Sequence, residues 1–211
     1  MKQKNQNLEK HSRNIFFAVF LCRPLGYVRT VVFSWLFGSS LITDAFFIAS
    51  AIPEFIRTFI ITGSMSSFFV PAASEFREDA NQYNRIWSTV LNICMLFSLV
   101  LSVLLALFPD TLINIFAPGF KGDTYITAVF SLTILSPVII LQAVFSVFIA
   151  GLNCKRYFFV PELAGVFWNL GFIVTMLALY RKLGIYAAAM GLLCGCILQI
   201  MFQFPAIVKA G

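Results

Sequence analysis

Four charged residues, Arg23, Arg29, Asp44 and Arg57, lie inside long apolar stretches of the sequence. On insertion scales one arginine at the centre of a spanning helix costs roughly 2.5–3.5 kcal/mol, so three deep arginines would cost on the order of 8–10 kcal/mol. The planar guanidinium binds phosphate and carboxylate groups in a bidentate manner, and such contacts are strong in a cavity of low dielectric constant. The three arginines therefore predict a site for an anion.

Simpler explanations remain open for each of these side chains. Arg23 and Arg29 could extend their charged ends to a headgroup layer. Arg57 could pair with Glu54, one helical turn earlier. Asp44 could be an N-cap or first-turn acid that stabilises the start of a helix.

A proline and a glycine, Pro24 and Gly26, separate the first two arginines. Along a regular helix Arg23 and Arg29 are about 9 Å and about 120° apart, and a kink at Pro24 would re-aim their side chains. Freed backbone groups at such a break are tolerated beside protein or a watery cavity. We therefore expect this segment to line a cavity, with Asp44 orienting an arginine or gating the outer mouth.

The composition places these charges in a membrane. Hydrophobic residues make up 60% of the 211 positions, charged residues 11%, and the mean hydropathy is +0.89. Windows of about 20 apolar residues predict spanning helices, and the absence of strict alternation argues against an outer-membrane barrel. We predict an all-α, polytopic protein with about six spanning helices, near residues 14–36, 41–63, 86–108, 126–150, 159–180 and 184–204.

The distribution of basic residues predicts the orientation. With the N-terminal tail, residues 1–13, in the cytoplasm, the inner segments hold Lys2, Lys4, Lys10, Arg13, Arg77, Arg85, Lys155, Arg156 and Lys209. The outer loops then hold only Lys121, Arg181 and Lys182. Positive residues favour the cytoplasmic side, so we expect a cytoplasmic N-terminus. The net charge of +6 follows from this bias and does not indicate a nucleic-acid partner.

The remaining reactive residues do not predict catalysis. Cys194 and Cys196 are close in sequence, but the single histidine, His11, falls in the tail. That ligand set is too small for a zinc site, and we expect no metal and no cofactor. Neither a Gly-rich phosphate loop nor a Ser/His/Asp set is present, so we expect a protein that is not an enzyme.

Several motifs carry a resemblance to a known family. RPLGYVR, TDAFFIA, IPEFIRT and GSMSSFFVPAASEF occur in this order, followed by IFAPGF, AGLNCKRYFFVPELAGVFWNLGFI and LQIMFQFPAIVKAG. Together they resemble the N-terminal region of the MurJ (MviN) family of lipid II flippases. The resemblance implies a transporter of the multidrug/oligosaccharidyl-lipid/polysaccharide exporter superfamily. Such a protein moves an undecaprenyl-diphosphate-linked muropeptide lipid across the bacterial inner (cytoplasmic) membrane by alternating access.

The resemblance also implies roles for individual residues. Arg23 and Arg29 correspond to arginines of the family's first helix and Arg57 to one of its second helix, which implies substrate binding. Asp44 corresponds to the aspartate of TDAFF, which implies a role in gating. These residues are the same ones that the cost of burying charge singles out.

Three positions depart from the family pattern. Thr30 and Thr62 stand where the family usually has acids, and Thr58 stands where it has a second basic residue. The exchange leaves the predicted cavity more positive by one charge and removes possible salt-bridge partners. It therefore affects the expected gate more than the expected anion site.

The chain corresponds to one of the two six-helix lobes that the family resemblance implies. It could be a truncated product, a lobe that pairs with a separate second lobe, or half of a homodimer. Rival functions are another exporter of the same superfamily, for a polysaccharide lipid or a drug, and a non-transporting membrane scaffold. An inactive gene remnant is a further alternative. A cationic drug would need buried acids, whereas the deep charges here are mostly basic.

Overall fold

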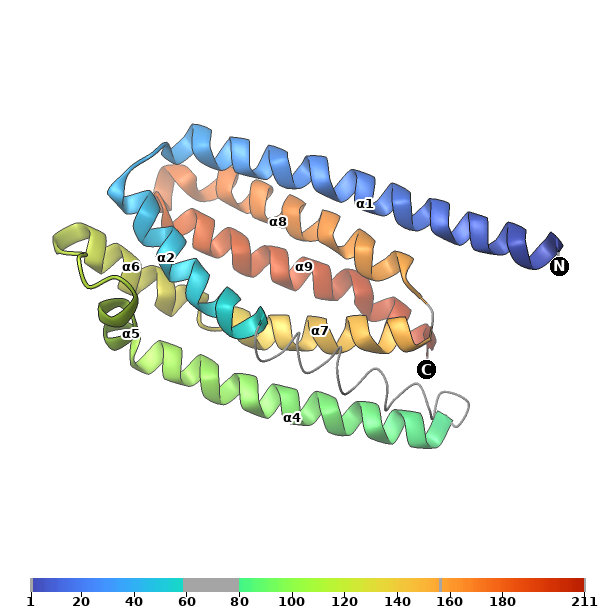
Figure 1. Ribbon diagram of the computed structural model, residues 1–211. Helices are drawn as coiled ribbons and strands as arrows, with labels where there is room; N and C mark the ends of the chain where they lie inside the picture. Colours follow the sequence, from blue (N-terminus) through green and yellow to red (C-terminus); the bar gives the residue numbers. More distant parts are fainter. Residues whose placement is uncertain (1, 59–79, 156, 211) are drawn as a thin grey trace.

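The computed structural model describes residues 2–58, 80–155 and 157–210, and it is all-α over these ranges (Figure 1). The described helices are α1 (Lys2–Phe37), α2 (Leu41–Ile56), α4 (Ala80–Leu107), α5 (Pro109–Phe116), α6 (Gly122–Leu135), α7 (Val138–Cys154), α8 (Phe159–Leu183) and α9 (Tyr186–Ala210). The predicted all-α membrane architecture is confirmed.

Among the described residues, four helices are long and apolar enough to cross a membrane: Phe16–Phe37, Asn84–Leu107, Phe159–Leu183 and Tyr186–Lys209. The bent pair of α6 and α7 gives a fifth span if it crosses as one unit. The predicted window 41–63 corresponds to α2, and its last residues, 59–63 with Thr62 among them, lie outside the described residues. Helix α1 starts at Lys2, so no boundary separates the expected tail from the first span.

A break at Pro137 divides the predicted window 126–150 into α6 and α7, which meet at an angle of 41°. Proline has no N–H to bond the carbonyl of Thr133 and its ring crowds that carbonyl. Ser136 replaces the lost donor, because its hydroxyl donates to the Thr133 carbonyl over 2.9 Å. The bend is therefore stabilised locally by the residue before the proline.

Several helix ends carry residue types that are common at such positions: a glycine with positive φ, a serine N-cap and a first-turn proline. Gly38, between α1 and α2, has φ +62°, a backbone conformation that glycine adopts without strain. Ser40 is the N-cap of α2, since its side chain accepts a hydrogen bond from the Thr43 N–H over 3.2 Å. Pro109 stands in the first turn of α5, where its missing N–H costs little. This short helix was not predicted.

Helices α8 and α9 form the most closely packed pair of the described chain. A Cβ added to Gly195 of α9 would lie 2.6 Å from the carbonyl oxygen of Trp168 on α8, and one added to Gly171 of α8 would lie 2.8 Å from the Cα of Gly195. Small residues let the two backbones approach, as in other membrane helix pairs. Helix α1 packs on the outer side of α8, and α4 packs on α7 (Figure 1).

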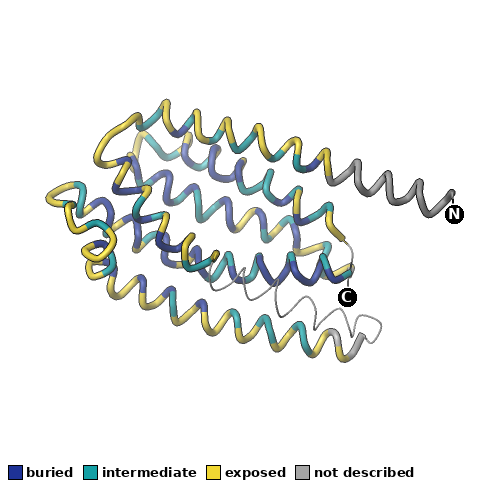
Figure 2. The backbone as a smooth tube through the Cα atoms, in the orientation of Figure 1, coloured by how far each residue is buried: buried dark blue, intermediate teal, exposed yellow. Residues whose placement is uncertain are grey.

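The exposed surface of the bundle is strongly apolar. On α1 and α4 most described residues are exposed (Figure 2), including Phe16, Trp35, Leu96 and Val100. Monomeric soluble proteins rarely expose so many large apolar side chains side by side. The outer faces of α1 and α4 are therefore suited to contact with lipid or another membrane-embedded surface.

Candidate functional site

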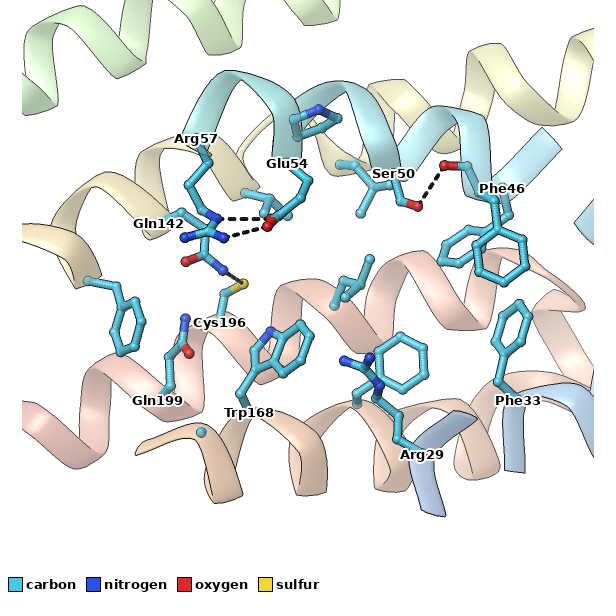
Figure 3. A pocket seen from close by; sticks show the side chains of 18 of the residues that line it. Arg29, Phe33, Phe46, Ser50, Glu54, Arg57, Gln142, Trp168, Cys196 and Gln199 are labelled. Atoms are coloured by element: carbon cyan, nitrogen blue, oxygen red, sulfur yellow. Dashed lines mark hydrogen bonds and ion pairs between the residues drawn. The ribbon is translucent and has the colours of Figure 1, made fainter. Parts of the chain in front are cut away.

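A cavity of about 540 Å³ lies between α1, α2, α8 and α9, with the bend of α6 and α7 on a further side (Figure 3). The residues that line it are Arg29, Thr30, Phe33, Phe46, Phe47, Ser50, Pro53, Glu54, Arg57, Leu135, Val138, Gln142, Phe145, Gly165, Trp168, Phe172, Leu192, Cys196 and Gln199. Two of the three predicted arginines are among them.

Arg29 is held against aromatic rings. Its guanidinium carbon lies 4.4 Å from the ring centre of Trp168 and 5.5 Å from that of Phe172, both on α8. Within the described part of the chain, Arg29 makes no hydrogen bond or ion pair. Cation–π contacts orient a guanidinium by its face and leave the N–H groups at its edge available. The arrangement suits binding of an oxyanion at that edge.

Arg57, by contrast, is engaged in an ion pair. Its Nε donates to Oε2 of Glu54 over 2.9 Å, and its Nη2 pairs with Oε1 of the same carboxylate. The two residues are three positions apart, one turn of helix. The alternative that Arg57 pairs with Glu54 is therefore confirmed, and an incoming anion would have to compete with, or share, this carboxylate.

Arg23 and Asp44 lie elsewhere. Both are exposed and neither lines the cavity. Helix α1 continues through Pro24 without interruption, so Arg23 and Arg29 remain on different sides of one helix. Asp44 stands in the first turn of α2, and its N–H bonds the carbonyl of Ser40 over 3.0 Å. The structure does not bring the three arginines and the aspartate together at one point.

One end of the cavity is closed by a phenylalanine cluster, defined here as Phe33, Phe37, Phe46 and Phe47. The ring centres of Phe33 lie 5.1 Å from Phe37, 5.5 Å from Phe46 and 5.2 Å from Phe47. These distances are typical of favourable aromatic pairs. The cluster joins α1 to α2 near the loop that connects them.

The opposite end of the cavity, the polar end, consists of Glu54, Arg57, Gln142 and Gln199 (Figure 3). Gln142 on α7 donates its amide Nε2 to the Cys196 thiol of α9 over 3.3 Å. Gln199 lies one turn further along α9 and is only 3% exposed.

The sequence reasoning missed both glutamines and the position of Trp168. A polar amide within an apolar span was the available signal, because such groups are rare in a membrane unless they find partners.

No group of three or more His, Cys, Asp or Glu side chains that could hold a metal ion occurs among the described residues. The five cysteines are all free thiols. The chemistry that the cavity offers is therefore hydrogen bonding and charge.

Comparisons with known proteins agree on one family. The family model described as "Lipid II flippase MurJ" matches residues 33–211. A lipid II flippase MurJ of Thermosipho africanus is 35% identical over 192 residues, covering 91% of this chain and 40% of that protein. A probable lipid II flippase MurJ of Buchnera aphidicola subsp. Acyrthosiphon pisum is 30% identical over 209 residues, covering 96% of this chain and 41% of that protein.

A solved structure described as "Lipid II flippase MurJ, inward closed conformation" has the same fold. The TM-score is 0.80 at 35% sequence identity, and the similarity covers 92% of this chain and 42% of that one. The chain spans about two fifths of the length of the curated relatives it matches.

Proposed function

This chain belongs to the MurJ family of lipid II flippases, and we propose that it forms one lobe of a transporter that flips a lipid-linked peptidoglycan precursor. The substrate would be an undecaprenyl-diphosphate-linked muropeptide lipid, moved from the inner to the outer leaflet of the bacterial inner membrane by alternating access. In this arrangement the N-terminus is cytoplasmic, as the distribution of basic residues predicts.

The observation that carries the proposal is the position of Arg29. A cation inside an apolar bundle is costly, and such residues mark substrate pathways. The Arg29 guanidinium lines the cavity and is fixed by Trp168 and Phe172 rather than by a carboxylate. Its N–H groups are therefore available to a diphosphate.

Arg57 supplies a second cation in the same cavity, and Arg23 a third on α1 outside it. With a cytoplasmic N-terminus, Arg23 lies nearer the inner leaflet than Arg29, because it precedes Arg29 on α1. We therefore assign the first contact with the lipid diphosphate to Arg23, and the contacts inside the cavity to Arg29 and Arg57. Asp44, at the start of α2, is assigned to the outer gate.

A second lobe would complete the site. The chain corresponds to about 40% of its relatives, and the cavity is lined here by one bundle. We propose that a further membrane-embedded lobe packs against this one and encloses the head group, and that its contact covers part of the exposed apolar surface of α1.

The test is binding of undecaprenyl diphosphate to the chain in lipid nanodiscs, followed by native mass spectrometry. Arg29→Ala should weaken binding by at least tenfold, because charge-assisted hydrogen bonds to phosphate are lost. Arg181→Ala is the matched control, since Arg181 is an exposed arginine in the last turn of α8 and does not line the cavity. Equal affinity of the Arg29→Ala variant and the unchanged chain would contradict the proposal, as would an equal loss in the control.

A further inference from the structure

Two buried N–H donors lie on the α8 and α9 side of the cavity and have no oxygen acceptor within the described residues. They are the side-chain amide nitrogen Nε2 of Gln199 and the indole Nε1 of Trp168, and the indole has only the Cys196 thiol, a weak acceptor, beside it. Both residues line the cavity. Figure 3 shows Trp168 on α8 and Gln199 on α9, on the same side of the cavity as Arg29 and opposite Arg57 and Glu54.

Such donors are expensive when they stay unbonded. Leaving a buried donor unsatisfied costs about 1–3 kcal/mol, and buried polar groups in native structures are almost always paired with protein or ordered water. One donor without a partner and one with only a thiol beside it, both on residues that line the same cavity, therefore indicate that an oxygen acceptor on a bound molecule completes their hydrogen bonding.

The chemistry of these groups selects the ligand. Both groups are N–H donors, so the matching groups are oxygen acceptors, and a hydroxyl or carbonyl oxygen is sufficient because neither donor carries a charge that needs balancing. Arg29 lies against the ring of Trp168 and provides the cationic part of the same wall. An anion at Arg29 would then be followed by a neutral, oxygen-rich group at Trp168 and Gln199.

We infer that Gln199 and Trp168 form a second subsite, beside the anion site, that accepts hydroxyl or carbonyl oxygens of the glycan in a lipid-linked head group. The inference rests on the proposed function, because it assumes that the diphosphate lies at Arg29. It assigns the discrimination between a glycan-bearing lipid and the bare lipid diphosphate to these two donors.

Helix α9 provides a matched control at Gln203. This glutamine is fully buried, and its side-chain Nε2 and Oε1 have no partner among the residues that the structure describes. It stands one turn after Gln199 on the same helix, but it does not line the cavity. Replacing Gln203 therefore changes the same chemical group in the same helix without touching the proposed subsite.

The experiment compares two probes, undecaprenyl diphosphate and undecaprenyl-diphosphate-linked disaccharide-pentapeptide, binding to the chain in nanodiscs. We expect the unchanged chain to prefer the glycan-bearing lipid by about tenfold. Gln199→Met should reduce this preference about fivefold through loss of the amide donor. Trp168→Phe should reduce it about threefold, since it removes the N–H but keeps an aromatic ring under Arg29. Gln203→Met should keep the preference.

The outcomes separate the two proposals. If the unchanged chain binds neither lipid, the proposed function fails. If it binds both lipids equally, the anion site stands and the second subsite is overturned. The subsite is also overturned if Gln199→Met and Trp168→Phe both keep the full preference, or if Gln203→Met lowers it as much as Gln199→Met. Should Gln199→Met not fold, the result for Trp168→Phe decides.

Discussion

The two ends of the cavity bury different kinds of side chain: aromatic rings at one end, and charged and amide groups at the other. At one end the rings of the phenylalanine cluster pack against one another between α1 and α2. At the other, the polar end, charged and amide groups from α2, α7 and α9 surround open space, and the Gln199 amide nitrogen is unbonded. The phenylalanine cluster needs no ligand to complete its contacts, whereas the polar end has a buried donor that lacks an acceptor.

This difference separates stability from recognition. Apolar rings contribute by contact and exclusion of lipid or water, and they need no partner beyond the bundle. A buried donor without an acceptor destabilises the fold by about 1–3 kcal/mol, and a ligand that supplies the acceptor removes this cost. We therefore expect changes in the phenylalanine cluster to act on the fold, and changes in the polar end to act on the choice of ligand.

The largest expected effect is on stability, from Phe33→Ala. Phe33 is 5% exposed and contacts Phe37, Phe46 and Phe47. Truncating a buried phenylalanine typically costs 3–5 kcal/mol, and we expect about 3 kcal/mol, measured as the free energy of unfolding in detergent. The affinity ratio between the two lipid probes should not change.

Phe204→Ala is the control for this variant, because Phe204 is 57% exposed on the surface of α9. Its effect on the free energy of unfolding should stay below about 0.5 kcal/mol. An equal loss in both variants would mean that the cluster does not stabilise the junction of α1 and α2. A changed affinity ratio between the two lipid probes in Phe33→Ala would contradict the view that the phenylalanine cluster acts on stability alone.

A second, smaller loss of stability is expected from Gly195→Ala. This variant should also lower the preference for the glycan-bearing lipid. The added methyl would lie 2.6 Å from the Trp168 carbonyl oxygen and 3.0 Å from the Trp168 side chain. Overpacking costs roughly 1–3 kcal/mol, and we expect about 2 kcal/mol as the helices separate. Because Trp168 must move, the preference for the glycan-bearing lipid should also fall.

Gly119→Ala is the matched control, since a methyl added there meets no atom within 4 Å. It should leave both the unfolding free energy and the lipid preference close to those of the unchanged chain. A Gly195→Ala variant with normal stability and normal preference would show that α8 and α9 can separate without disturbing the cavity wall.

Of the four charged residues that the sequence singled out, two line the cavity, and the neutral cavity residues were missed. Arg29 and Arg57 were found because an arginine in an apolar helix needs compensation, whatever the fold. The pairing of Arg57 with Glu54 followed from helical spacing. Trp168 and Gln199 gave little signal, since their importance depends on which helices pack together, and that is fixed by glycine contacts between α8 and α9.

The helix boundaries were also predicted only in part from the sequence. Four of the six predicted windows coincide with described helices that are long and apolar enough to cross a membrane, because membrane burial dictates length and composition. The window 126–150 is divided at Pro137 by a bend of 41°, and the Ser136 hydroxyl bonds the freed Thr133 carbonyl there. The expected kink at Pro24 did not interrupt α1. One proline broke its helix and the other did not, so the residue type alone was insufficient.

The smallest expected effect is a change in lipid affinity caused by replacing Glu54 at the polar end. Glu54→Gln removes the carboxylate that holds Arg57 and leaves two cations in the described cavity lining, Arg29 and Arg57. A partly exposed ion pair of this kind contributes roughly 0–1 kcal/mol, so stability should change little. Binding of undecaprenyl diphosphate should strengthen about threefold at low salt, because the lipid no longer competes with Glu54.

Salt dependence distinguishes this explanation from a change in shape. If charge is the cause, the gain should shrink as ionic strength rises, since salt screens a partly open site. Asp123→Asn is the control, because Asp123 is an exposed acid at the start of α6 and does not line the cavity. It should leave the affinity unchanged. Weaker binding in Glu54→Gln would mean that the carboxylate holds Arg57 in its binding position, and Glu54 would then assist the anion rather than compete with it.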